Sequence, residues 1–251
     1  MESTEFLPPA MFARPDGLRL AYRHRAGQGP TVVFLPGYMS NMEGGKAVAL
    51  DDWAGRSRRA MLRLDYAGNG ASEGRFDEGT LAGWRDDVLL LIDSLVEGPV
   101  VLVGSSMGGW LALLVALARP GRVAGLVGIA AAPDFTDWGF TDADKALLAT
   151  EGRIVEPSPY GEEPSVTTLG FWQSGQDLRV LESELAIDCP VRLLQGQDDP
   201  EVPWQTALRL AAQLRSSDVQ TLLVKDGDHR LSRDADIALL IRTVAALLDQ
   251  L

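Results

Sequence analysis

The stretch from Val100 to Trp110 constrains the fold of this chain more than any other. Four apolar residues, Val-Val-Leu-Val, run directly into Gly-Ser-Ser-Met-Gly-Gly-Trp. The apolar run predicts a strand buried on both faces, and helical character follows as far as Ala118. Turning from strand to helix so quickly strains the backbone of Ser106 and leaves almost no room for side chains at Gly104 and Gly108. The turn would raise the Ser106 hydroxyl at a helix N-terminus, so we take Ser106 as a candidate nucleophile rather than an ordinary serine.

Size and charge narrow the class of protein. The chain has 251 residues, of which 46% are hydrophobic, and a formal net charge of −12. That length suits one domain, residues 1–251, with one sizeable core. An acidic surface repels phosphate backbones and anionic lipid, so we expect no nucleic-acid partner. The single cysteine, Cys189, predicts no internal disulfide and a reducing compartment; we expect it to be a small buried apolar residue.

Targeting and membrane signals are the next question. Glu2 and Glu5 precede any basic residue, and no continuous apolar region follows them, so the N-terminus resembles neither a secretory signal nor a mitochondrial transit peptide. The apolar stretch 100–118 is broken by its glycine-rich turn into a strand and a helix, each too short to cross a bilayer. We therefore expect no membrane span and a cytoplasmic location.

Hydrophobic periodicity predicts strands that alternate with helices. We expect strands at 18–23 (an edge strand), 31–35, 60–65, 100–103, 124–131, 191–194 and 221–224, and helices at 42–54, 80–96, 110–118, 204–214 and 237–251. Strands separated by helices of ten or more residues pair in parallel, with right-handed crossovers. The fold class is therefore α/β, a mostly parallel central sheet with helices on both faces.

Residues 133–188 interrupt this pattern and predict a small cap over the sheet. We expect short helices near 142–150 and 178–185, with a Pro/Gly-rich passage at 156–161 between them. The insertion also carries the aromatic residues Phe135, Trp138, Phe140, Phe171 and Trp172. Two interpretations are open for these side chains: they line an acyl pocket, or they pack the cap onto the core.

A nucleophilic serine needs a base and an acid that orients the base. Of the two histidines, His24 lies in Arg-His-Arg beside an early turn and is expected to be a surface or structural residue. His229 follows the last strand, and loops after parallel strands gather at the sheet edge that carries Ser106. In the loop after the strand 191–194, Asp198 and Asp199 both qualify as the acid, with Glu201 further along.

Two backbone N–H groups are expected to stabilise an oxyanion. One belongs to Met107, directly after the nucleophile, and the other to Tyr38, in the loop that follows the strand 31–35. The segment 68–72, Gly-Asn-Gly-Ala-Ser, lacks the spacing of a nucleotide-binding loop and predicts a tight turn. We expect no cofactor and no metal.

Taken together, these motifs resemble the α/β-hydrolase superfamily over essentially the whole chain. The matching segments are Leu-Pro-Gly-Tyr at 35–38, Asp-x-x-Gly-x-Gly-x-Ser at 65–72, Gly-x-Ser-x-Gly at 104–108, Gly-x-x-Asp-x-x-Val-Pro at 196–203 and Asp-His at 228–229. By this resemblance the acid is Asp199. Where many members have His-Gly after the oxyanion-loop strand, this chain has Pro36-Gly37.

A narrower resemblance lies within that superfamily. Segments 36–40, 104–111, 198–204 and 232–237 are similar to the abhydrolase-domain palmitoyl-protein thioesterase and acyl-glucuronide esterase group. The resemblance implies a serine hydrolase that cleaves carboxylic esters or acyl thioesters, with a small-molecule or acyl-chain substrate or an S-acylated protein. The alternatives are a lactonase, an amidase or a C–C bond hydrolase on the same residues, or a ligand-binding protein that has kept the scaffold without catalysis.

Overall fold

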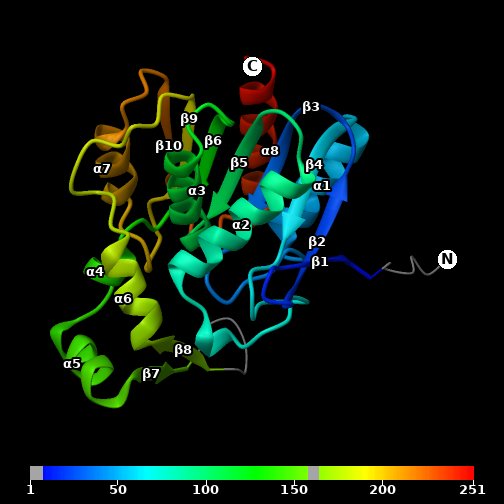
Figure 1. The fold of residues 1–251 in the computed structure, drawn as a ribbon. Helices are drawn as coiled ribbons and strands as arrows, with labels where there is room; N and C mark the ends of the chain where they lie inside the picture. Colours follow the sequence, from blue (N-terminus) through cyan, green and yellow to red (C-terminus); the bar gives the residue numbers. More distant parts are fainter. Residues whose placement is uncertain (1–7, 158–163) are drawn as a thin grey trace.

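The computed structural model describes residues 8–157 and 164–251 (Figure 1). Its centre is an eight-stranded sheet in the order β1-β2-β4-β3-β5-β6-β9-β10. The strands are β1 (Ala10–Ala13), β2 (Arg19–Arg25), β3 (Gln28–Leu35), β4 (Arg59–Leu64), β5 (Val100–Ser105), β6 (Val123–Ile129), β9 (Val191–Gly196) and β10 (Val219–Val224). From β4 to β10 all neighbours are parallel, which confirms the predicted mostly parallel sheet.

The strand predicted at 18–23 forms, but it is not the edge of the sheet. It becomes β2, which pairs antiparallel with β4 on one side and with β1 on the other. Strand β1 has only four residues, Ala-Met-Phe-Ala, and is too short for its alternation to stand out in the sequence. The edge position therefore passes to β1.

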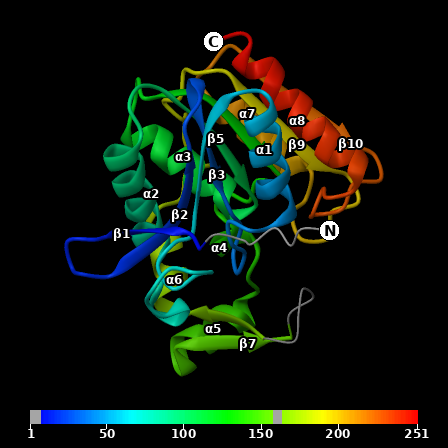
Figure 2. The ribbon, with the colours of Figure 1, turned by 90° about the vertical axis from the view of Figure 1, so that its right-hand side faces the viewer.

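Helices cover both faces of the sheet, as predicted. One face carries α2 (Leu81–Leu95), α3 (Met107–Ala118) and α7 (Gln205–Gln213), and the other carries α1 (Gly45–Arg56) and α8 (Asp234–Leu248). Figure 2 shows the sheet between α2 and α3 on one side and α1 and α8 on the other. The side chains of β5 alternate between the two cores, with Val100 and Leu102 in one and Val101 and Val103 in the other.

Helix α3 explains the long apolar stretch of the sequence. Ten of its twelve residues, Met107 to Ala116, are buried, so this helix is apolar on every side because it lies in the interior of the protein. In the ranges 8–157 and 164–251, we find no helix with the length and apolar character needed to span a bilayer.

The predicted insertion 133–188 contains α4 (Phe135–Trp138), α5 (Asp142–Glu151), β7 (Arg153–Glu156), β8 (Ser165–Thr168) and α6 (Leu169–Asp177). The elements from α4 to α6 lie beyond the carboxyl ends of the sheet strands, and the chain after α6 runs back to the amino end of β9 (Figure 1). Strands β7 and β8 form an antiparallel pair of their own, which the sequence patterns do not predict. A 3-10 turn, η1 (Phe76–Glu78), contacts β8 from the main domain. Residues 158–161 of the expected Pro/Gly-rich passage lie outside the described residues.

The prediction of a helix near 178–185 is wrong, and the structure has a helix in the preceding residues, α6. Thr168 caps it by accepting a hydrogen bond from the Phe171 amide at 3.2 Å, and α6 ends at Asp177. Residues 178–185 contain apolar side chains at helix-like spacing, but they are buried along an irregular chain. The Asp134 carboxylate accepts hydrogen bonds from the amides of Val180 and Leu181, both at 2.8 Å, and so fixes this segment without a helix.

That carboxylate also joins the two ends of the insertion. Asp134 stands at the start of the segment, with φ of 58°, and Val180 and Leu181 stand near its end. The Asp134 residue is 3% exposed, and burial raises the pKa of its carboxyl despite the two amide donors. The start of the insertion is therefore tied to the residues that follow α6, and from there the chain runs on to the amino end of β9, where Val191 pairs with Leu126.

Candidate active site

Ser106 stands at the turn between β5 and α3 in a strained conformation. Its φ of 54° and ψ of −119° lie in a region that non-glycine residues rarely adopt. The two glycines explain how the turn fits. A Cβ added to Gly104 would lie 2.2 Å from the carbonyl oxygen of Gly108, and one added to Gly108 would lie 2.1 Å from that of Leu35. The backbone here is packed too closely for any larger residue.

The structure brings Ser106, His229 and Asp199 together from three separate loops. His229 Nε2 lies 3.0 Å from Ser106 Oγ, and His229 Nδ1 lies 2.9 Å from Asp199 Oδ2. With the Nδ1 proton directed at the carboxylate, Nε2 is the acceptor for the serine hydroxyl. The three side chains can therefore pass a proton from the serine to a base that an acid holds in place.

Asp199 is held by four donors. Its Oδ1 accepts from the amides of Glu201 and Val202, both at 2.9 Å, and its Oδ2 accepts from Gln195 Nε2 at 3.0 Å in addition to His229. The carboxylate is fully buried. Burial acts to raise its pKa, but the hydrogen bonds from His229 and the two amides outweigh that effect and hold the pKa of Asp199 below its ordinary value. The group remains an anion beside the imidazole.

The other two acidic candidates lie elsewhere. Asp198 is exposed, and its backbone amide donates to Gly227 at 3.0 Å. The side chain of Glu201 reaches the opposite edge of the imidazole, with Oε2 at 3.6 Å from His229 Nε2. Asp199 is therefore the acidic residue that contacts Nδ1.

Several contacts fix the loop that carries His229. An added Cβ at Gly196 would lie 2.2 Å from the Gly227 carbonyl oxygen, so the ends of β9 and β10 meet closely there. The Leu231 amide donates to Asp228 Oδ1 at 2.9 Å. The ammonium group of Lys46, at the start of α1, donates a hydrogen bond to the carbonyl oxygen of Arg230. Burial lowers the pKa of Lys46 to about 8. No sequence signal identified Lys46, because α1 and this loop are far apart in the chain.

The loop after β3 lies against Ser106. A Cβ added to Gly37 would lie 3.4 Å from the Ser106 Cβ, so the backbone of Gly37, the residue before Tyr38, passes beside the serine. Met107 follows Ser106 as the first residue of α3, at the N-terminus of that helix. Both predicted oxyanion donors thus belong to backbone segments next to Ser106.

The side chain of Tyr38 connects this loop to the inserted segment that contains β8 and α6. Its hydroxyl donates to the Val166 carbonyl oxygen on β8 at 2.6 Å, and its ring centroid lies 4.8 Å from that of Phe171 on α6. Burial raises the pKa of the Tyr38 hydroxyl well above its ordinary value. Trp84 of the main domain packs against both rings, at centroid distances of 5.9 Å from Tyr38 and 5.4 Å from Phe171.

The remaining cap aromatics mostly hold the cap together. Phe135 packs against Trp110 and Phe171, while the indoles of Trp138 and Trp172 donate to the carbonyl oxygens of Pro133 and Thr136 at 2.8 Å. Of the two open interpretations, packing of the cap onto the core applies to Phe135 and Phe171.

Two other residues singled out in the sequence lie outside this cluster. His24 pairs with Leu62 inside the β2–β4 ladder. Cys189 is partly buried, and burial raises the pKa of its thiol to about 11, which leaves it protonated. Among the residues that the structure describes, no group of three or more His, Cys, Asp and Glu side chains is arranged to hold a metal ion.

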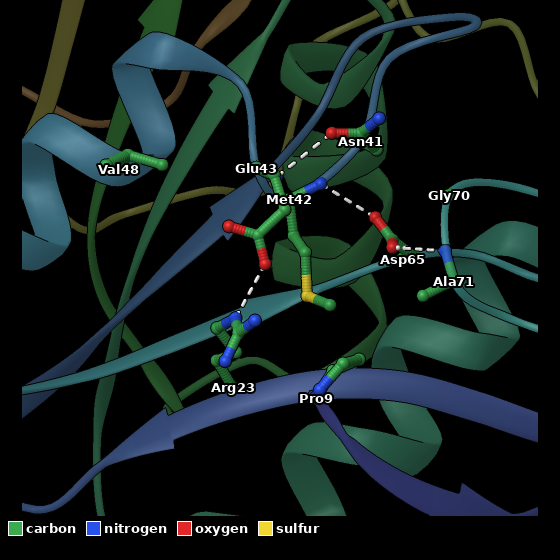
Figure 3. A pocket seen from close by; sticks show the side chains of 9 residues that line it. All are labelled: Pro9, Arg23, Asn41, Met42, Glu43, Val48, Asp65, Gly70 and Ala71. Carbon is green, nitrogen blue, oxygen red and sulfur yellow. Dashed lines mark hydrogen bonds and ion pairs between the residues drawn. The ribbon is translucent and has the colours of Figure 1, made fainter. Parts of the chain in front are cut away.

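A hollow of about 490 Å³ lies beside the β2 and β4 end of the sheet, and its lining does not include Ser106, Asp199 or His229 (Figure 3). Its charged groups are already paired: Arg23 binds Glu43 at 2.6 Å, and Asp65 accepts from the amides of Met42 and Ala71. The bond from the Ala71 amide to Asp65 holds the turn predicted at 68–72.

The fold and the geometry around Ser106 agree with the comparisons with known proteins. Residues 32–242 match the profile of the alpha/beta hydrolase family, and the chain belongs to that family.

Its relatives include palmitoyl-protein thioesterase ABHD10 of Homo sapiens, named mitochondrial, which is 41% identical over 242 residues and aligns over 95% of this chain and 79% of its own length. The solved structure of mouse alpha/beta hydrolase domain-containing protein 10 is 39% identical, with a TM-score of 0.90 over 97% of this chain and 99% of the mouse chain. Est1E from Butyrivibrio proteoclasticus, with bound ferulic acid, has a TM-score of 0.79 over 96% of this chain and 98% of its own, and at 19% identity it supports the fold alone. The predicted resemblance is confirmed.

The expected cytoplasmic location is wrong by the same comparison. Five mammalian relatives, each at least 40% identical to this chain, are named mitochondrial. The expectation rests on the charge and hydropathy of the first residues, and residues 1–7 lie outside the described structure. That pattern is not sufficient to assign a compartment.

Proposed function

We propose that this protein is a serine hydrolase that cleaves acyl thioesters and carboxylic esters through an acyl-enzyme on Ser106. One observation carries the proposal: His229 lies within hydrogen-bond distance of both Ser106 and Asp199, and the serine has a strained backbone at a helix N-terminus. No cofactor enters the reaction.

Acylation begins when His229 Nε2 takes the proton of the Ser106 hydroxyl. The Ser106 oxygen then forms a bond to the acyl carbon, and the carbonyl π electrons move to its oxygen. Asp199 keeps the imidazole in the required tautomer and stabilises its positive charge, because its carboxylate stays ionised beside Nδ1. The amides of Met107 and Tyr38 donate to the oxyanion, and loss of one such donor costs roughly 100- to 1,000-fold in turnover.

The tetrahedral intermediate collapses when the bond to the leaving sulfur or oxygen breaks. His229 Nε2–H donates its proton to that atom, and the thiol or alcohol departs. Water enters on the same side, gives a proton to Nε2 and attacks the acyl carbon. Collapse of the second intermediate releases the carboxylic acid, and the proton returns from His229 to Ser106.

The substrate class follows from the relatives and the cap. The ABHD10 relatives are named palmitoyl-protein thioesterases, which favours acyl thioesters and S-acylated proteins as substrates. Residues 1–251 act as one hydrolase domain in which segment 133–188 is the cap, and the contact between Tyr38 and Val166 supports that role.

The test is steady-state hydrolysis of matched thioesters and oxygen esters, from acetyl to palmitoyl, by the natural chain and by Ser106→Ala. We expect hydrolysis that depends on Ser106 and that rises with chain length on thioesters. Activity confined to short oxygen esters would remove the depalmitoylating role, and a Ser106→Ala variant as active as the natural chain would overturn the mechanism. Labelling of Ser106 by a fluorophosphonate separates the enzyme from a binding protein on the same scaffold.

A further inference from the structure

Glu201 places a second carboxylate beside the atom that protonates the leaving group. Its Oε2 lies 3.6 Å from His229 Nε2, and its side chain is 42% exposed. The Glu201 amide donates to Asp199 Oδ1 at 2.9 Å, so the backbone beneath this side chain is fixed to the acid of the site. Within residues 8–157 and 164–251, the two carboxylates that come within 4 Å of the imidazole of His229 lie one at each ring nitrogen.

The two carboxylates differ in what they face. Asp199 is fully buried and contacts Nδ1, the ring nitrogen that does not face Ser106. Glu201 is partly exposed and faces Nε2, the nitrogen that exchanges its proton with Ser106 and then with the departing atom. Proton transfer requires the departing sulfur or oxygen to come within roughly 3 Å of Nε2. The start of every leaving group therefore lies within about 7 Å of the Glu201 carboxylate, less than the screening length of roughly 8 Å at physiological ionic strength.

We propose that Glu201 makes the leaving-group side of this site selective for charge: it favours thiols and alcohols flanked by positive groups and disfavours anionic ones. The Glu201 carboxylate attracts the leaving group of a cysteine thioester that lies in a basic stretch of a protein. It repels the anionic leaving groups of an acyl-coenzyme A and of an acyl glucuronide. This inference rests on the proposed function and narrows its substrate class. At this distance, a unit charge on the leaving group changes kcat/KM by about 3- to 30-fold, depending on local screening.

Glu201 also acts on the imidazolium, and the two effects can be separated. Stabilising a positive His229 lowers the barrier for every substrate by the same factor. Selectivity for charge, in contrast, changes the ratio between substrates that share an acyl chain and differ only in the charge of the leaving group. The ratio of kcat/KM between such substrates therefore reports charge selectivity alone, because an effect of the substitution that is equal for all substrates cancels.

The experiment uses three end-blocked peptides that carry an S-octanoyl cysteine flanked by lysines, serines or glutamates. We expect the natural chain to prefer them in that order. In Glu201→Gln, kcat/KM for the glutamate peptide, divided by kcat/KM for the serine peptide, should rise by three- to tenfold. The value for the lysine peptide, divided by that for the serine peptide, should fall. Glu201→Asp, which keeps the charge, should retain most of the preference, and 0.5 M NaCl should reduce it in the natural chain.

Glu97→Gln is the matched control. Glu97 is exposed and lies just before β5, at the amino ends of the strands. Its replacement by Gln changes the net charge of the protein by the same amount as Glu201→Gln. It should leave all three ratios unchanged. Equal factors for the three peptides in Glu201→Gln, or equal changes in both variants, would overturn the inference.

The same comparison with octanoyl oxygen esters of cationic, neutral and anionic alcohols distinguishes the two proposals. If thioesters are not cleaved but the oxygen esters follow the charge order, the thioesterase function fails and the role of Glu201 stands. If thioesters are cleaved without a charge order, the function stands and this inference fails. Hydrolysis of neither series refutes both.

Discussion

The hydroxyl of Tyr38 donates a 2.6 Å hydrogen bond to the carbonyl oxygen of Val166, and so links the loop beside Ser106 to the hairpin of the cap. The backbone of Gly37, the residue before Tyr38, passes next to Ser106, while the Tyr38 ring packs against Phe171 of α6. Tyr38 therefore contacts the inserted segment through its side chain and belongs to the loop that carries the proposed oxyanion donor.

Tyr38→Phe should loosen the cap without disturbing the chemistry of Ser106. The variant leaves the Val166 carbonyl without its donor, at a cost of about 1 kcal/mol. We expect KM for long acyl chains to rise more than KM for acetyl substrates, with faster hydrogen exchange in 165–168. Tyr22→Phe is the control, because the Tyr22 hydroxyl makes no hydrogen bond within the part of the chain that the structure describes. Equal exchange rates in both variants would contradict the link.

Gln195→Glu should strongly lower kcat/KM at neutral pH. Gln195 Nε2 donates to Asp199 Oδ2 at 3.0 Å, so the change sets two carboxylates against each other in a buried site. Repulsion would favour protonation of one of them and weaken the bond to His229. We expect kcat/KM to fall by at least about 100-fold, whereas Gln195→Met, which removes the hydrogen bond alone, should lose about 3- to 10-fold. Similar losses in the two variants would show that charge is not the cause.

The pKa of Asp199 gives a prediction about stability and pH. Because it lies below the ordinary value of 3.8, the ionised carboxylate stabilises the folded state. That contribution is complete above the pKa of the unfolded chain and is lost as the pH falls through the lower pKa of the folded one. The difference in free energy of unfolding between the natural chain and Asp199→Asn should therefore be full at about pH 5 and shrink as the pH falls below the ordinary value of 3.8. Urea titrations at pH 5 and pH 3 measure it, and a difference that grows over this interval would have the wrong sign.

Gly108→Ala should destabilise the whole fold. Its Cβ would lie 2.1 Å from the carbonyl oxygen of Leu35, and the backbone on both sides belongs to the core. We expect a loss of at least about 3 kcal/mol in the free energy of unfolding. Gly170→Ala, in α6, adds the same methyl group where no atom lies within 4 Å, and it should be neutral or slightly stabilising. Comparable losses would mean that the close packing at Gly108 does not matter.

The central sheet and the turn at Ser106 could be predicted because their signals are local. Buried parallel strands are continuous apolar runs, and a strand-to-helix turn this tight leaves no choice but glycine at its flanks. The choice between Asp198 and Asp199 has no local signal. Adjacent residues in one loop point in different directions, and hydrogen bonds from Gln195 and Val202 decide which of them faces His229.

The parts that sequence patterns missed depend on contacts between distant residues. Lys46 and Arg230 are 184 positions apart, and Tyr38 and Val166 are 128 apart. The false helix near 178–185 has the same origin, because apolar spacing suggests a helix where the Asp134 carboxylate holds an irregular chain. Strands of four residues, such as β1 and β7, are too short for alternation to be recognised.

The hydrogen bonds of Asp134 have a consequence for how such a protein can diversify. Because the Asp134 carboxylate binds the amides of Val180 and Leu181, the two ends of the excursion that holds α4, α5 and α6 are joined by hydrogen bonds that do not involve the pairing of the sheet strands. Lengthening a surface excursion of this kind costs little entropy. We expect that exchanging this excursion between relatives, with Asp134 retained, changes the preference for acyl chain length while Ser106, His229 and Asp199 keep their arrangement.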